Sequence, residues 1–184
     1  MTEIPEQNPS VLETIVRVLR DRGPIPLCSS AIWKPELTSE IQALTPTALD
    51  VFENEFYHCL RSGLHLWNDD LDRAHTIAQS IHSATGSLCH GIMHRRQGDF
   101  GNSKYWFQHV GDHPIFRPLL EEAKTIAAGR SEDPLAGSLS RSDNWDPDGF
   151  VDACRERGED DLLKAIQIRE IDLLVRFCFR QAGG

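Results

Sequence analysis

Apolar residues recur at intervals of three and four positions along most of this chain, which is the spacing of an amphipathic helix. The first such run is VLETIVRVLRDRG, and it directly follows Ser10. Glu13 stands three residues after the serine, so the two side chains predict a capping box at the start of a helix. Gly23 and Pro24 then stop the run. We therefore expect a first helix that ends before Gly23.

A second run covers residues 47–67 and predicts one helix with its apolar side chains on one side. These apolar residues are Phe56, Cys59, Leu60, Leu64 and Trp67. His58 and His65 project from the opposite side when successive residues are turned by about 100°. We therefore expect both histidines to be exposed to solvent and to have no function.

The remaining patterns predict further helices and no strands. A proline-rich stretch over 24–46 holds one short helix near 36–44, and later helices are expected over 70–83, 88–97, 102–110, 114–128, 147–157 and 160–181. The segment 129–147 is rich in Gly, Ser, Pro and Asp and predicts a surface loop. The sequence thus predicts an all-α fold, with residues 1–184 forming a single domain and one compact irregular helical bundle of about seven to eight helices.

Composition and charge narrow the classes of function. A chain of 184 residues with 40% hydrophobic residues can bury one substantial core. Its net charge of −9 opposes non-specific binding to nucleic acid or to anionic membranes. No apolar run approaches the roughly 20 residues of a membrane span, and the N-terminus MTEIPEQNPS does not resemble a secretory signal. We expect a cytoplasmic protein with no nucleic-acid or membrane partner.

The histidines are placed unevenly, since all eight lie within 58–113. Imidazole titrates and binds metals near neutral pH, so this segment is the expected location of a site. His90 and His94 are four residues apart and share one face of a helix. A divalent metal ion could be held by this pair together with His75 or His82 from the preceding helix. The alternative is a hydrogen-bonded or exposed pair that holds no metal.

Gly91 lies between the two histidines. A glycine inside a helix costs about 1 kcal/mol and permits close approach of a neighbouring element. We therefore expect this helix to be central, with His90 and His94 facing the interior or a cleft. The same glycine stands where the HExxH zinc motif has its catalytic glutamate, so that motif is absent.

The residues that follow form a second polar group, made of Arg95, Arg96, Asp99, Asn102, Lys104 and Tyr105. Guanidinium groups bind carboxylates and phosphates through paired hydrogen bonds, and a cationic island in an acidic chain attracts anions. We expect these residues to bind a small anionic or polar ligand. The alternative is that Arg95 and Arg96 pair with Asp99 or with the carbonyl groups that end the helix.

Over residues 66–116 the chain resembles a group of bacterial proteins with similar HGIMHRR and NSKYWF blocks and no assigned activity, and a weaker similarity lies at Trp145-Asp146-Pro147. The resemblance implies that one site contains His75, His90, His94, Arg95, Asp99, Asn102, Lys104 and Tyr105. It implies no reaction. The group is expected to have an aromatic residue near Cys89 and a glutamate near Gln97, and this chain has neither. The difference argues against an acid–base role at position 97.

These patterns lead to one leading hypothesis and two alternatives. The leading one is a His/Arg-lined cleft for a small anionic or polar ligand, in a hydrolase or lyase that uses His90, His94 and His75 as general acids or bases. The first alternative is a metal-binding protein that uses His90 and His94 with His75 or His82. The second alternative is a non-catalytic interaction module with an aromatic, histidine-rich face.

Overall fold

The computed structural model describes residues 10–130 and 132–184, and helices are the regular structure throughout these residues, with no strand among them. This confirms the expected all-α fold. The helices of the described part are α1 (Val11–Asp21), α2 (Pro35–Ala43), α3 (Pro46–Leu49), α4 (Glu55–Trp67), α5 (Leu71–Ala78), α6 (Ala84–Gln97), α7 (Phe100–Phe107), α8 (Phe116–Ala127), α9 (Pro134–Arg141), α10 (Pro147–Arg157) and α11 (Asp161–Ala182).

The predicted capping box at the start of α1 is present. The Ser10 hydroxyl accepts a hydrogen bond from the Glu13 backbone N–H at 3.2 Å, and the Glu13 carboxylate accepts one from the Ser10 backbone N–H at 2.7 Å. After α1, Gly23 adopts the left-handed conformation with φ 79°, which other residues rarely take. Local chemistry therefore sets both ends of this helix, as the sequence indicates.

The helix expected over 47–67 is divided into α3 and α4, and two residues explain the break. Asp50 is left-handed at φ 53°, which ends α3 after one turn. Asn54 then starts α4, because its side-chain oxygen accepts hydrogen bonds from the backbone N–H groups of Phe56 and Tyr57 at 2.9 and 3.1 Å. The expectation of one continuous helix is therefore wrong.

The segment 129–147 is more ordered than the surface loop expected there, because its described residues include α9. Asp133 starts this helix by accepting a hydrogen bond from the Leu135 backbone N–H at 2.9 Å. Both oxygens of Asp133 also accept hydrogen bonds from Arg157 of α10, each at 2.7 Å. Short helices such as α3 and α9 raise the helix count of the described residues above the seven to eight expected.

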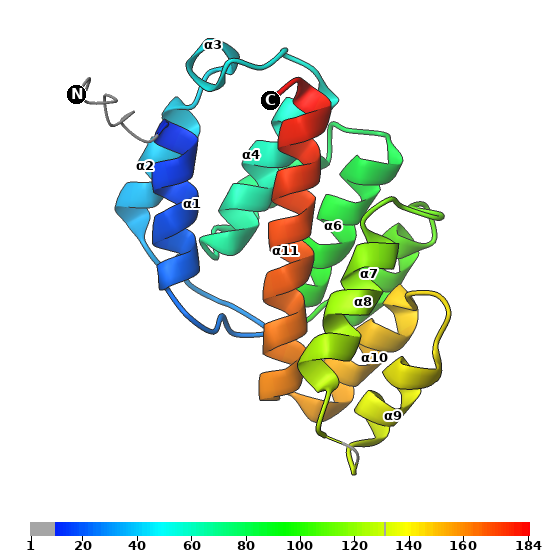
Figure 1. Ribbon diagram of the computed structural model, residues 1–184. Coiled ribbons are helices and arrows are strands. Elements are labelled where there is room, and N and C mark those ends of the chain that lie inside the picture. Colours follow the sequence, from blue (N-terminus) through cyan, green and yellow to red (C-terminus); the bar gives the residue numbers. More distant parts are fainter. Residues whose placement is uncertain (1–9, 131) are drawn as a thin grey trace, which may run out of the picture.

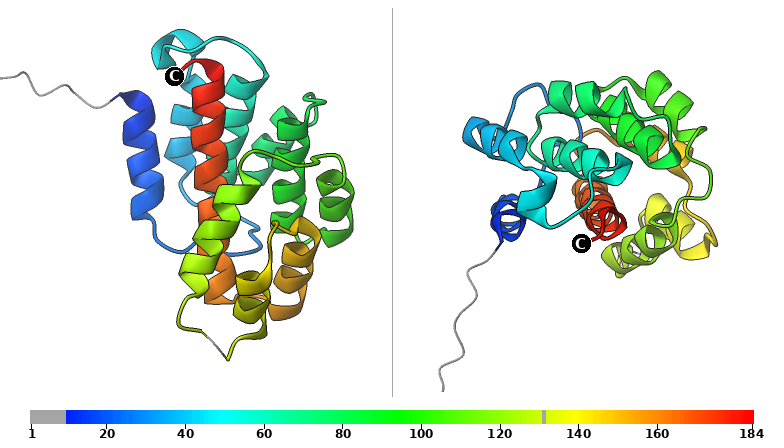
Figure 2. Two further views of the ribbon diagram at one scale, coloured as in Figure 1. Left: turned by 45° about the vertical axis from the view of Figure 1, so that its right-hand side comes forward. Right: turned by 90° about the horizontal axis from the view of Figure 1, so that it is seen from above.

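The long helix α11 forms the centre of the arrangement (Figures 1 and 2). Helix α11 packs against α4 and α8. On the other helices, α4 also packs against α5 and α6, and α7 lies in contact with both α6 and α10. Even this 22-residue helix carries charged residues along its length. No helix within residues 10–130 and 132–184 is both long enough and apolar enough to cross a membrane.

Helix α4 is covered on more than one side, and this changes the environment of its histidines. His65 is fully buried, with Nδ1 lying 3.4 Å from a carboxylate oxygen of Asp70, and burial lowers the pKa of His65 to about 4. His58 is half-buried and its ring lies 5.0 Å from that of Tyr57. The expectation that both are solvent-exposed is therefore wrong, because α4 packs against α5 and α6 as well as against α11.

Candidate metal centre

Three histidines converge where α5 packs against α6. His75 lies in the last turn of α5, and His90 and His94 lie one turn apart on α6. Each offers one potential ligand atom, and these three atoms all lie within 4.8 Å of one another. The ring centroid of His75 lies 5.0 Å from that of His90 and 5.5 Å from that of His94. We refer to these three residues as the histidine trio.

The trio is partly shielded from water. His90 is 2% exposed, and His75 and His94 are half-buried. The buried Nδ1 atoms of His90 and His94 have no hydrogen-bond partner among the described residues. Burial, together with the neighbouring imidazoles of the trio, lowers the pKa of His90 to about 4. Burial also lowers the pKa of His94, against an opposing effect of Asp99. Both rings are therefore neutral at pH 7 and can donate a lone pair to a metal.

Helix α7 forms one wall of the site. The Trp106 ring stacks on His90, with centroids 4.0 Å apart and planes 7° apart. Ser103 donates a hydrogen bond to the Gly91 carbonyl at 2.7 Å. A Cβ atom at position 91 would lie 3.0 Å from the Phe107 ring, so the close packing of α6 and α7 leaves little room for a side chain there. This agrees with the expectation that Gly91 permits close approach and that α6 is central.

Three of the four polar residues around the start of α7 bind partners within the protein. Asp99 caps the helix, with one oxygen accepting from the Asn102 backbone N–H at 3.1 Å and the other from the Asn102 side-chain amide at 2.6 Å. The second oxygen lies 4.0 Å from Nδ1 of His94, so Asp99 places a carboxylate beside the trio. Lys104 pairs with Asp152 of α10 at 2.6 Å. Tyr105 is 54% exposed and is accessible to a ligand.

Arg95 points away from the trio and into the core. Its guanidinium forms a two-pronged ion pair with Glu170 of α11, and the two side chains are 1% and 0% exposed. Gln167 also accepts from Arg95 at 3.4 Å, and the guanidinium lies 4.6 Å from the centre of the Phe150 ring. The structure therefore contradicts the expectation that Arg95 binds a ligand. It also contradicts the alternative of a pair with Asp99, because the partner comes from the C-terminal helix.

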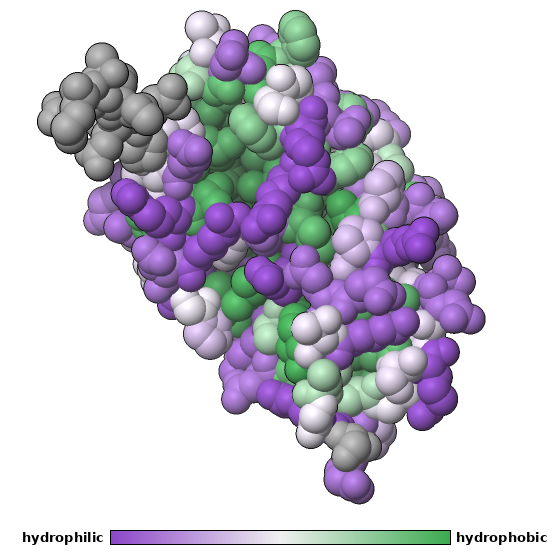
Figure 3. Space-filling view, viewed as in Figure 1, coloured by the Kyte–Doolittle hydropathy of each residue, from purple (hydrophilic) through white to green (hydrophobic). Residues whose placement is uncertain are grey.

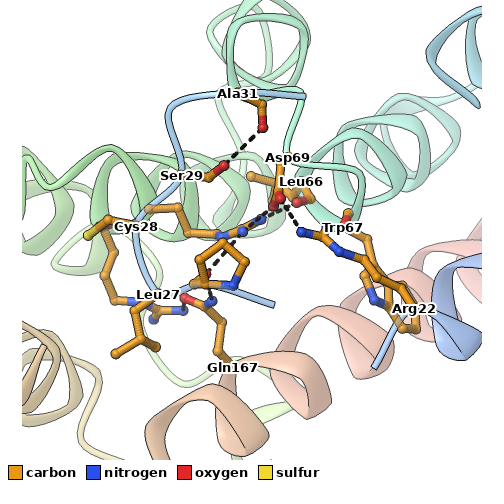
Figure 4. A network of polar contacts seen from close by, with 12 residues as sticks. Arg22, Leu27, Cys28, Ser29, Ala31, Leu66, Trp67, Asp69 and Gln167 are labelled. Carbon is orange, nitrogen blue, oxygen red and sulfur yellow. Dashed lines mark hydrogen bonds and ion pairs between the residues drawn. The ribbon is translucent and has the colours of Figure 1, made fainter. Parts of the chain in front are cut away.

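Arg96 is fully buried in a second network, which Figure 4 shows from close by. Its guanidinium donates to the Asp69 carboxylate and to the backbone carbonyls of Leu66 and Pro26. Arg22 pairs with the other oxygen of Asp69, which is itself left-handed at φ 62°. These hydrogen bonds and ion pairs hold the irregular segment between α1 and α2 against α4 and α6. The expectation that Arg96 binds an anion is therefore wrong.

The remaining histidines lie outside the trio. His82, which the sequence offered as an alternative third ligand, is exposed and is not among the convergent residues. His113 is buried, and its Nε2 atom lies 3.1 Å from the hydroxyl oxygen of Thr85. Burial lowers the pKa of His113 to about 4. The spacing in the sequence predicted the His90–His94 pair. Nothing in the residues that neighbour His113 in the sequence indicated that it would be buried.

Two hollows of the described surface, of about 690 and 760 Å³, lie over α8, α9 and α10, and their walls contain none of the three histidines. The trio itself lies between α5, α6 and α7. Comparison with protein-family models, curated proteins and solved structures found no significant match.

Proposed function

We propose that this protein binds one divalent transition-metal ion, Zn²⁺ or a metal of similar preference, through His75, His90 and His94. The observation that carries the proposal is the convergence of three potential ligand atoms within 4.8 Å. Nitrogens bound at about 2.0–2.1 Å to a tetrahedral Zn²⁺ lie about 3.4 Å from one another. Modest rotations of the imidazoles, each about an ångström at the nitrogen, close that difference.

The protonation states favour binding. Metal ligation needs a neutral imidazole, and a ring that is charged at working pH must first lose its proton. His90, whose pKa burial lowers to about 4, is already neutral at pH 7. Imidazole nitrogen suits Zn²⁺, Cu²⁺ or Ni²⁺, whereas Mg²⁺ and Ca²⁺ prefer oxygen ligands. The donor set therefore supports a transition metal over the alkaline-earth ions.

A metal held by the trio alone keeps an open coordination position. Catalytic zinc sites have three protein ligands and one exchangeable position, whereas structural sites are closed by four. Within the described residues no Cys, Asp or Glu joins the trio in the convergent group, and the Asp99 carboxylate, 4.0 Å from Nδ1 of His94, is already bound to Asn102. This favours metal-assisted hydrolase or lyase chemistry, with the histidines as ligands instead of general acids or bases. In this proposal a small anion would be attracted by the metal ion, because Arg95 and Arg96, which were expected to attract it, are buried.

Metal titration of tag-free protein tests this proposal. Co²⁺ binding is followed by visible absorbance, Zn²⁺ by competition, and Trp106 gives a second signal because it stacks on a proposed ligand. We expect one equivalent per chain, and loss of affinity by at least about 100-fold in His75→Gln and in His94→Gln. That loss exceeds the 10–100-fold typical of outer-shell changes. Mg²⁺ and Ca²⁺ should not compete.

The matched control is His82→Gln, which removes an exposed histidine outside the trio. It should bind Co²⁺ as the wild type does, and the metal-free unfolding of each variant shows whether its fold is intact. Equal loss in His82→Gln and His75→Gln would refute the assignment. If Co²⁺ binds as expected, added azide should shift its absorbance by occupying the open position. An unchanged spectrum would mean that the metal site is closed and structural.

A further inference from the structure

Two adjoining hollows lie where α8 meets α9 and the start of α10, and their walls contain none of the three histidines. The larger has a volume of about 690 Å³ and the smaller a volume of about 120 Å³. Asn144 and Trp145 line both of them, so the two hollows share a wall. Figure 3 shows green, apolar surface between purple, hydrophilic side chains in this region. One small ligand could therefore extend from the larger hollow into the smaller one.

The smaller hollow is mostly apolar. Its walls include Leu120 of α8, Leu135 and Leu139 of α9, and Phe150 of α10. The Trp145 ring packs against that of Phe150, with centroids 5.1 Å apart. A volume of 120 Å³ equals that of about four water molecules at ~30 Å³ each. The smaller hollow therefore suits one branched alkyl or phenyl group and is too small for a long alkyl chain.

The larger hollow carries unpaired charges of both signs. Lys124 and Glu121, which line it, pair with one another at 3.4 Å. Arg117, Asp112 and Asp143 also line it, and none of these three has an ion-pair partner within the described residues. A ligand with only a carboxylate would be repelled by the two acids, and one with only an ammonium group by the arginine. A ligand that carries both groups can pair with each sign.

These charges lie close to the shared wall. Arg117 stands one turn of α8 before Leu120, which lines the smaller hollow, and Asp143 directly precedes Asn144. Trp145 is 7% exposed, and its indole N–H has no hydrogen-bond partner among the described residues. Buried donors are normally paired. An acceptor on a ligand at the shared wall would supply the missing partner.

We propose that the two hollows bind a free α-amino acid with an apolar side chain of the size of leucine, methionine or phenylalanine. The side chain would occupy the smaller hollow, the carboxylate would meet Arg117, and the ammonium group would meet Asp143. Both charged groups of an α-amino acid are attached to one carbon, which would lie at the shared wall. The site shares no residue with the proposed metal centre and is independent of it.

Calorimetry with small ligands tests the proposal. Alanine, 2-aminobutyrate and norvaline should bind with affinities that rise about fourfold for each added methylene, the fold-change equivalent to about 0.8 kcal/mol. The two analogues of leucine that lack one charge are 4-methylpentanoate and 3-methylbutylamine, and each should bind at least tenfold more weakly than leucine. An affinity for glycine or for either analogue equal to that for leucine would overturn the proposal, as would no binding of leucine at 10 mM.

Variants locate the binding and assign the two charges. Arg117→Gln should lower leucine affinity by at least tenfold without weakening the binding of 3-methylbutylamine. Asp143→Asn should lower leucine affinity without weakening the binding of 4-methylpentanoate. Leu139→Phe adds bulk to the wall of the smaller hollow and should weaken leucine binding more than glycine binding.

The matched control is Arg130→Gln, which changes an exposed arginine outside both hollows. It should bind leucine as the wild type does, and an equal loss in Arg130→Gln and Arg117→Gln would refute the assignment. Thermal unfolding without ligand shows whether each variant keeps its fold. If Leu139→Phe does not fold, the two charge variants and the methylene series decide.

Discussion

Replacement of Arg95 by Met tests the central correction to the sequence-based interpretation, that this arginine is structural. Methionine keeps an unbranched stem in the core and removes the guanidinium. Glu170, which is 0% exposed, then loses its ion-pair partner inside the bundle. Breaking a buried pair from one side costs about 3–5 kcal/mol, because a charge remains buried without compensation. We expect a loss of that size in the free energy of unfolding.

Urea unfolding measures this loss. The double variant Arg95→Met/Glu170→Met removes both charges and should recover most of the loss, since an apolar replacement of a buried pair is often neutral or stabilising by about 1–4 kcal/mol.

Lys104→Met is the matched control, because Lys104 and Asp152 form a half-exposed pair whose side chains are 30% and 35% exposed. Such a pair is worth about 0–1 kcal/mol. If Arg95→Met costs no more than Lys104→Met, or if the double variant is as unstable as the sum of the single changes, the buried pair does not stabilise the fold as argued.

Two further predictions concern other buried residues. His65 and His113 each have a pKa that burial lowers to about 4, from an ordinary value near 6.5, so the unfolded chain binds more protons between these values. The stability that depends on these two residues should be complete above that window and fall by up to about 2.7 kcal/mol per pH unit as the pH drops through it, in addition to the contributions of His90 and His94. Chemical unfolding of His65→Gln, with one fewer such group, should show a shallower slope, and an equal slope would contradict the assignment. Gly91→Ala places a Cβ 3.0 Å from the Phe107 ring. Overpacking of about 1–3 kcal/mol should exceed the gain of about 1 kcal/mol in helix propensity, so we expect a net loss of stability. Thermal unfolding at or above that of the wild type would show that α7 can move aside.

The sequence predicted those features that depend on residues close together in the chain. The capping box of Ser10 and Glu13 spans one turn of helix, and His90 and His94 are likewise one turn apart. Their interactions follow from helical geometry alone. The close packing at Gly91 was also readable, because glycine inside a helix usually marks a close approach.

The features that the sequence did not predict depend on partners far along the chain. Arg95 meets Glu170 75 positions later, and Arg96 meets Asp69 27 positions earlier. Nothing in the local pattern distinguishes a buried arginine with such a partner from an exposed one that awaits a ligand. The same holds for His65, because a helical wheel describes one helix and cannot show that α5 and α6 also pack against it.

The three consecutive residues His94, Arg95 and Arg96 point in three directions from the last turns of α6. The first joins the trio, the second is held by α11, and the third is held by α4 and the segment after α1. Turning α6 enough to move His94 would break both buried ion pairs. The backbone of α6 at His90 and His94 is therefore held in place by the core, so metal binding would need only the side-chain rotations of the trio and no movement of this helix. Holding the backbone in place lowers the conformational entropy that is lost on binding.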